Sequence, residues 1–66
     1  MHDDRENILV RVLAAFASGK RLVSERSDNL ETDHKLVSKA LSRMGLKKGI
    51  TIAEDEEKGL LWFKKK

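Results

Sequence analysis

The sequence predicts an α+β fold in which three helices, at about residues 3–18, 24–30 and 33–44, precede a C-terminal β-hairpin at about residues 49–64. Two observations lead to this prediction. Apolar residues recur at helical spacing in the first and third segments, and after Gly45 the pattern changes to short extended runs around a polar turn. The 66 residues are expected to form one domain, spanning residues 1–66, because a chain of this length supports a single core.

The first helix is predicted from apolar residues at i, i+1, i+4, i+5 and i+8, which form one core-facing stripe: Ile8, Leu9, Val12, Leu13 and Phe16. Asp3 and Glu6 approximate a capping box at its start, and Gly19 is a suitable stop. A second, thinner apolar line runs along the same helix through Val10, Ala14 and Ala17. This line is either ordinary exposed surface or a contact between subunits.

The segment between the two long helices has weaker patterns. Leu22 and Val23 follow a glycine and favour a short strand. Residues 24–30 are predicted as a short helix that Ser24 can cap, and residues 31–33 as the turn after it. A helix this short depends on packing against its neighbours.

The helix at about residues 33–44 has two different faces. Its apolar residues are expected to face the core: Leu36, Val37, Ala40, Leu41 and Met44. The opposite side carries cations and small polar groups and no carboxylate: His34, Lys35, Ser38, Lys39, Ser42 and Arg43. Thr32 or Asp33 is the expected N-cap, and Gly45 is expected to end the helix in a left-handed conformation. The charged face is either a solvated surface or a surface that binds phosphates and base edges.

The hairpin is predicted from alternating Ile50 and Ile52, a polar tip at residues 54–59, and the apolar run at residues 60–63. Gly59 can supply the positive φ that the turn needs. The second strand is apolar on both faces, so either Leu61 and Phe63 or Leu60 and Trp62 face the core. The outward pair then needs a cover, which makes Leu60 and Trp62 candidates for a dimer interface together with the apolar line on the first helix.

Composition limits the possible functions. The net charge is +3, from 14 basic and 11 acidic residues, and the two signs are segregated along the chain. No catalytic constellation or phosphate loop is evident, so we expect neither an enzyme nor a cofactor or small-molecule ligand. Without cysteines, and with His2 and His34 far apart in sequence, no metal site is expected. No apolar run is long enough for a membrane span, and a cytoplasmic location is expected.

The predicted order of helix, short strand, helix, turn, basic helix and hairpin resembles the winged helix-turn-helix DNA-binding superfamily. Residues 25–41, ERSDNLETDHKLVSKAL, are similar to the helix-turn-helix pattern at Leu30, at residues 37–41, and in the Gly45-Leu46 pair that leads to the wing. Ser27, Glu31 and Thr32 depart from that pattern. The acidic tip also differs from wings that grip DNA, because phosphates would repel Asp55, Glu56 and Glu57.

The resemblance implies sequence-specific binding of double-stranded DNA by a small transcriptional regulator, with the basic helix in the major groove. A homodimer on a two-fold site is the expected working form. The expected contacts to bases and phosphates come from the basic helix and from four flanking cations: His34, Lys35, Ser38, Lys39, Ser42, Arg43, Lys20, Arg21, Lys47 and Lys48. The alternatives are a protein-interaction module that uses the acidic tip and the apolar hairpin face, and a module that binds structured RNA.

Overall fold

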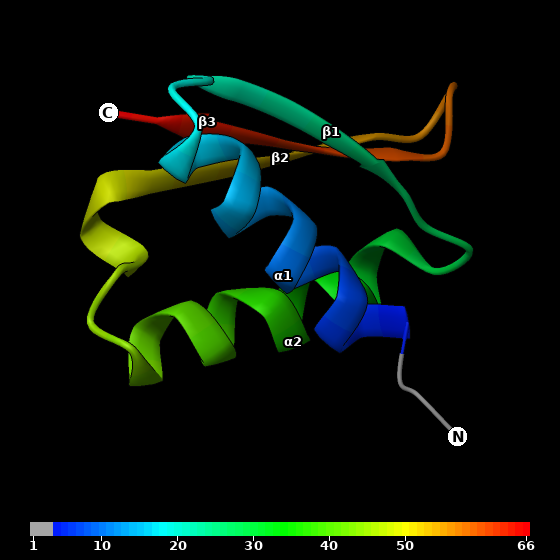
Figure 1. Ribbon diagram of the computed structural model, residues 1–66. Helices are drawn as coiled ribbons and strands as arrows, with labels where there is room; N and C mark the ends of the chain where they lie inside the picture. Colours follow the sequence, from blue (N-terminus) through cyan, green and yellow to red (C-terminus); the bar gives the residue numbers. More distant parts are fainter. Residues whose placement is uncertain (1–3) are drawn as a thin grey trace.

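A three-stranded antiparallel sheet with two helices on one of its faces forms the structure (Figure 1). The computed structural model describes the backbone of residues 4–66 and the side chains from residue 8 onward. The elements follow in the order α1 (Asp4–Ala17), β1 (Leu22–Arg26), α2 (Leu30–Arg43), the 3₁₀ turn η1 (Lys47–Gly49), β2 (Ile50–Asp55) and β3 (Leu60–Lys65). The strand order is β1-β3-β2, so the last strand lies in the middle of the sheet.

The predicted helix at residues 24–30 is wrong, and with it the arrangement of three helices and a wing. Residues 24–26 extend β1, where Ser24 pairs with Trp62 and Arg26 pairs with Leu60. The reason lies in β3, whose residues 60–63 are all apolar: a hydrophobic strand is disfavoured at the edge of a sheet, and pairing with β1 protects its second edge. The predicted hairpin is present as β2 and β3, but it forms two strands of a three-stranded sheet.

The helix α2 begins at Leu30, three residues before the predicted start. Its N-cap is Asn29, whose side-chain oxygen accepts a hydrogen bond from the Thr32 N–H at 3.2 Å, so the prediction of Thr32 or Asp33 as the cap is wrong. Ser27 donates a short hydrogen bond to the buried Asp33 carboxylate and accepts one from the Asn29 N–H. Residues 27–29, from the second half of the predicted short helix, therefore form the turn that starts α2.

Replacing Asn29 with alanine is expected to lower the free energy of unfolding by about 1 kcal/mol, because the Thr32 N–H loses its acceptor. Urea unfolding followed by circular dichroism measures this loss. Asp28→Ala, at the exposed neighbouring position, is the matched control and should change stability by less than about 0.5 kcal/mol. Equal losses in the two variants would contradict the role of Asn29 as the cap.

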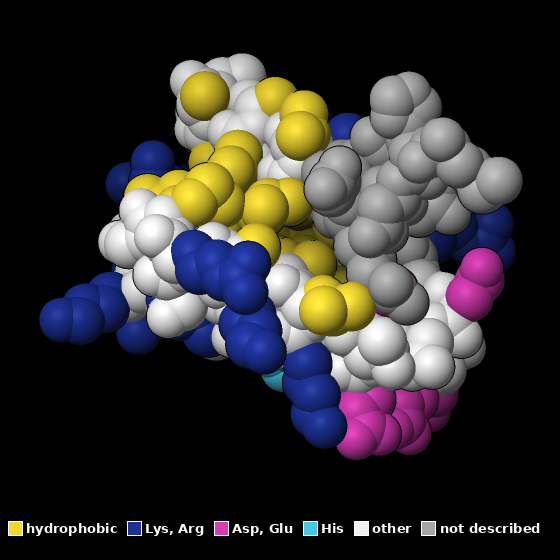
Figure 2. Space-filling model, turned by 90° about the horizontal axis from the view of Figure 1, so that it is seen from below, with side chains coloured by type: hydrophobic (Ala, Val, Ile, Leu, Met, Phe, Trp, Pro, Cys, Tyr) yellow, Lys and Arg dark blue, Asp and Glu magenta, His cyan; other side chains and the backbone are white. Residues whose placement is uncertain are grey.

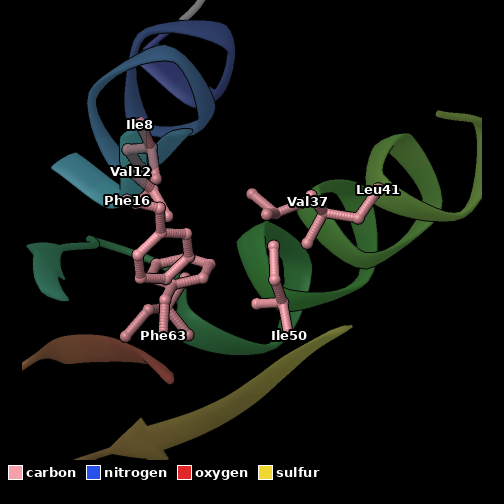
Figure 3. Close-up of a cluster of buried hydrophobic side chains, with 8 residues drawn as sticks. Ile8, Val12, Phe16, Val37, Leu41, Ile50 and Phe63 are labelled. Carbon is pink, nitrogen blue, oxygen red and sulfur yellow. The ribbon is translucent and has the colours of Figure 1, made fainter. Parts of the chain in front are cut away.

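The core lies between the sheet and the helices (Figure 3), and its residues come from every main element except β1: Ile8, Val12, Phe16, Val37, Leu41, Ile50, Leu61 and Phe63. Leu61 and Phe63 are fully buried, which settles the register that the sequence left open. The predicted apolar stripe of α1 is confirmed, with Leu9 and Leu13 packed at the margin.

The predicted apolar stripe of α2 is only half correct. Val37 and Leu41 are buried, whereas Leu36 and Met44 are 40% and 47% exposed. The helix turns its Val37 and Leu41 row to the core, and the neighbouring row of Leu36, Ala40 and Met44 consequently lies on the rim. The apolar surface on α2 is therefore wider than one core contact requires.

Two glycines with positive φ stand where the chain changes direction: Gly45 follows the end of α2, and Gly59 lies in the turn between β2 and β3. Gly45 has φ +73°, and the Leu46 N–H donates to the Leu41 carbonyl at 2.9 Å, so α2 ends in the left-handed turn that was predicted. Gly59 has φ +65° in the hairpin turn, also as predicted. Its carbonyl accepts a hydrogen bond from the Ser27 N–H at 2.9 Å, which continues the pairing between β1 and β3. The capping box predicted for Asp3 and Glu6 lies outside the described side chains.

Candidate nucleic-acid interface

The outer side of α2 carries a row of cations. Lys35, Lys39 and Arg43 are exposed and stand at i, i+4 and i+8, so they lie along one line of the helix. Figure 2 shows the face on which α2 lies, where a band of Lys and Arg side chains crosses the surface. Ser38 and Ser42 belong to the adjacent row, on the side of the helix toward η1. The structure therefore places these predicted binding residues on one surface.

Acidic side chains accompany the cations at the N-terminal end of α2. The Lys35 ammonium lies 3.6 Å from the Glu31 carboxylate, and both side chains are largely exposed. His34 Nδ1 lies 2.6 Å from Glu54 Oε2 of β2, which ties the helix to the sheet. The expectation that no carboxylate lies beside this row is wrong, because α2 begins early enough to include Glu31. The uncompensated charge of α2 is thus in its C-terminal half, at Lys39 and Arg43.

The C-terminal half of α2 points toward the end of the molecule where η1, the α1–β1 turn and the C-terminus of the chain lie (Figure 1). The Lys65 N–H donates to the Arg21 carbonyl at 2.9 Å, and the Lys66 N–H donates to the Gly49 carbonyl at 2.8 Å. These hydrogen bonds hold three separate basic segments side by side. We call this group the basic end, and its residues are Lys20, Arg21, Lys47, Lys48, Lys64, Lys65 and Lys66.

None of the residues of the basic end forms an ion pair with another described residue. All except the half-buried Lys47 are exposed. Lys64, Lys65 and Lys66 were not among the predicted site residues, although a run of three lysines at the chain end was visible. These three lysines join the basic end because β3 is the central strand, so the end of β3 lies between Arg21 and Gly49.

The opposite end of the sheet is acidic. Residues 54–57 are acidic and span the end of β2 and the start of the β2–β3 turn. The turn before α2, which contains Asp28 and is followed by Glu31, lies at the same end (Figure 1). A shallow hollow lined by Asp28, Glu31, Glu54 and Glu56 joins the two segments. The basic and acidic segments, which are separate in the sequence, therefore lie at opposite ends of the sheet. Phosphates would be attracted to one end and repelled from the other.

The candidate dimer residues lie on two different faces. Val10, Ala14 and Ala17 are exposed on α1, with Val10 at 65% exposure. Leu60 and Trp62 are half-buried on the sheet face that carries no helix. The structure does not bring these two groups together.

Within the part of the chain that the structure describes, no group of three or more His, Asp or Glu side chains could hold a metal ion. Neither α1 nor α2 has the length and apolar character needed to cross a membrane.

Comparison of the chain with models of protein families, with curated proteins and with solved structures finds no match.

Proposed function

We propose that the protein binds double-stranded DNA through the C-terminal half of α2 and the adjoining basic end, as a small regulator of transcription in the cytoplasm. The observation that supports this most is the convergence of Lys39, Arg43 and the basic end on one side of the molecule, without acidic partners among the described residues. Cations that carry no internal partner are the ones that can release counterions from DNA. This proposal rests on charge placement and does not require the three-helix arrangement.

The geometry of α2 suits a groove of duplex DNA. It packs on the helical side of the sheet with its cation row exposed to solvent, and a major groove admits a helix of this kind (Figure 1). Lys39 and Arg43 would meet phosphates or guanine edges, and Ser38 and Ser42 would add shorter hydrogen bonds. The basic end, which continues beyond the end of α2, would hold the flanking backbone. His34 would contribute less than the sequence suggested, because its Nδ1 is already bonded to Glu54.

The double variant Lys39→Ala, Arg43→Ala tests this proposal. Duplex binding is expected to weaken strongly, and the slope of log K against log salt should become shallower by about 2, since two phosphate contacts are lost. Fluorescence anisotropy with a random duplex at several salt concentrations gives both quantities. Unchanged affinity in a folded double variant would overturn the assignment.

The control variant Lys35→Ala, Lys58→Ala removes the same formal charge from other places. Lys35 has Glu31 beside it, and Lys58 lies in the acidic turn between β2 and β3. We expect this variant to lose much less affinity than the double variant on α2. An equal loss would mean that binding follows net charge and has no defined site.

A protein-interaction module is the second candidate, and the apolar surface beside the cation row favours it. Figure 2 shows apolar side chains next to the band of Lys and Arg. Leu36, Met44 and Leu46 are each at least 40% exposed, more than a core row would be. The absence of duplex binding by the parent protein at low salt would favour this function over DNA binding. Duplex RNA competing as well as duplex DNA would instead indicate a structured-RNA partner.

A further inference from the structure

The sheet has one face that no part of residues 4–66 covers. Both helices pack against the other face (Figure 1). Leu61 and Phe63 are buried on that side, in the core with residues of both helices. Because side chains alternate along a strand, Leu60, Trp62 and Lys64 of the central strand point to the open face. We call this the outer face. It carries a tryptophan at its centre and Leu22, which is 57% exposed, near one corner.

The strand register arranges the outer face in three rows that cross β1, β3 and β2. The middle row is Ser24, Trp62 and Ala53, so the indole stands between two small residues. The indole Nε1–H donates to Asp55 Oδ2 at 3.5 Å, which directs the ring across the sheet toward β2. Small neighbours leave room for a flat surface to approach the ring.

The row nearest the hairpin turn is Arg26, Leu60 and Asp55. It places a cation on one edge strand and an anion on the other, two strand spacings or about 10 Å apart. Neither residue forms an ion pair with another described residue. This row is therefore complementary in charge to a reversed copy of itself.

We propose that the outer face is a homodimer interface in which two sheets pack face to face about a two-fold axis parallel to β3. That axis exchanges the positions of β1 and β2, so Arg26 of each copy lies opposite Asp55 of the other copy. Trp62 then meets Trp62, and Leu60 meets Leu60. Lys64 meets Lys64 at the far edge, where the long side chains can extend into solvent. The proposal does not depend on DNA binding, because the outer face lies opposite α2 and shares with the basic end only Lys64, at its edge.

A two-fold axis perpendicular to the strands fits less well. It would place Arg26 opposite Leu22 and Asp55 opposite Thr51, so both charges would be covered by groups that do not pair with them. Covering an unpaired charge is costly, and the axis parallel to β3 avoids that cost. Packed sheets keep their strands within about 30° of each other, an angle at which long Arg and Asp side chains at the corner still meet.

The interface is small. Three strands about 4.8 Å apart and about 20 Å long give a face smaller than that of standard stable complexes, which bury about 800 Å² on each partner. The dimer is consequently expected to form at tens to hundreds of micromolar protein. Sedimentation equilibrium over that range is the measurement that detects it.

A charge exchange tests the pairing. Arg26→Asp puts an acid at both corners of the row, and Asp55→Arg puts a base at both corners. Each variant alone is expected to dimerise at least about tenfold more weakly than the parent, because both contacts between copies become repulsive. An equimolar mixture of the two variants should recover dimerisation close to that of the parent, since both contacts are again between opposite charges.

Two further variants keep the test interpretable. Asp55 also accepts a hydrogen bond from the Lys58 N–H, so Asp55→Arg removes a contact within the turn. The variant Ala53→Arg avoids this: it adds bulk at an exposed position of the outer face and should abolish the dimer without unfolding the chain. Arg43→Asp makes the same charge change as Arg26→Asp, but on α2, and should leave the mass distribution unchanged. A parent that stays monomeric at hundreds of micromolar, or a mixture that fails to recover while both variants are folded, would overturn the proposal. DNA binding retained by Ala53→Arg would show that the two proposals stand separately.

Discussion

Replacing Phe63 with alanine is expected to leave much of the protein unfolded at 37 °C. Phe63 is fully buried on the central strand, among residues from both helices (Figure 3). Truncation of a buried phenylalanine costs about 3–5 kcal/mol, and a chain of this length has a total stability of only about 3–10 kcal/mol. The variant should show a much lower urea midpoint, measured by circular dichroism, or no cooperative transition.

Two comparisons make that result specific to the core. Phe63→Leu keeps most of the apolar volume and should lose less than half as much stability as the alanine variant. Val10→Ala removes a side chain that is 65% exposed and should change stability by less than about 0.5 kcal/mol. If the alanine variant at Phe63 unfolds at nearly the same urea concentration as the parent, Phe63 is not in the core.

The two long helices and the hairpin could be predicted because each combines a repeating apolar pattern with marked ends. The stripe from Ile8 to Phe16 and the glycines at 19, 45 and 59 correspond to elements that the structure contains. The short segment before Leu30 could not be predicted in the same way, because its polar residues suit a helix, a strand or a turn. Its conformation is set by a distant partner, the edge of β3.

One feature of the sequence did point to the correct sheet. The run at residues 60–63 is apolar throughout, and native sheets avoid leaving a hydrophobic strand at an edge, so such a run favours a central position. Combined with Leu22 and Val23, it favours a third strand at residues 22–26. The resemblance to a helix-turn-helix pattern led instead to a helix there, although Ser27, Glu31 and Thr32 depart from that pattern and weakened the prediction.

The row of cations on the helix could be predicted from the sequence, whereas the contacts and segments that surround this row could not. Spacing alone placed Lys35, Lys39 and Arg43 on one row of a helix, as the structure has them. The contact between His34 and Glu54 joins residues 20 positions apart, so no local pattern reveals it. The basic end likewise depends on the order of strands, because its three segments meet only where β3 ends.

Removing charge from the basic end is expected to produce the largest change in DNA affinity. The variant Lys20→Gln, Arg21→Gln, Lys47→Gln, Lys48→Gln neutralises four cations from two segments that flank the end of β3. If each meets one phosphate, the slope of log K against log salt becomes shallower by about 3–4, and affinity at low salt falls by at least about 100-fold. The four positions lie outside the apolar core, so the fold should be retained. Anisotropy titrations from low to physiological salt give both values.

The decisive comparison is the loss of DNA affinity for each charge that a variant removes. Arg26→Gln, Lys58→Gln neutralises two cations at the acidic end, where Glu56 and Glu57 would repel DNA. If binding is localised at the basic end, this variant loses little affinity, because its cations are held away from the duplex by their own acidic neighbours. Similar losses per charge in the two variants would show instead that DNA responds only to the net charge of the protein. A shallow salt slope in the parent itself would exclude phosphate contacts as the main source of binding and would move the function toward the apolar surface beside the cation row.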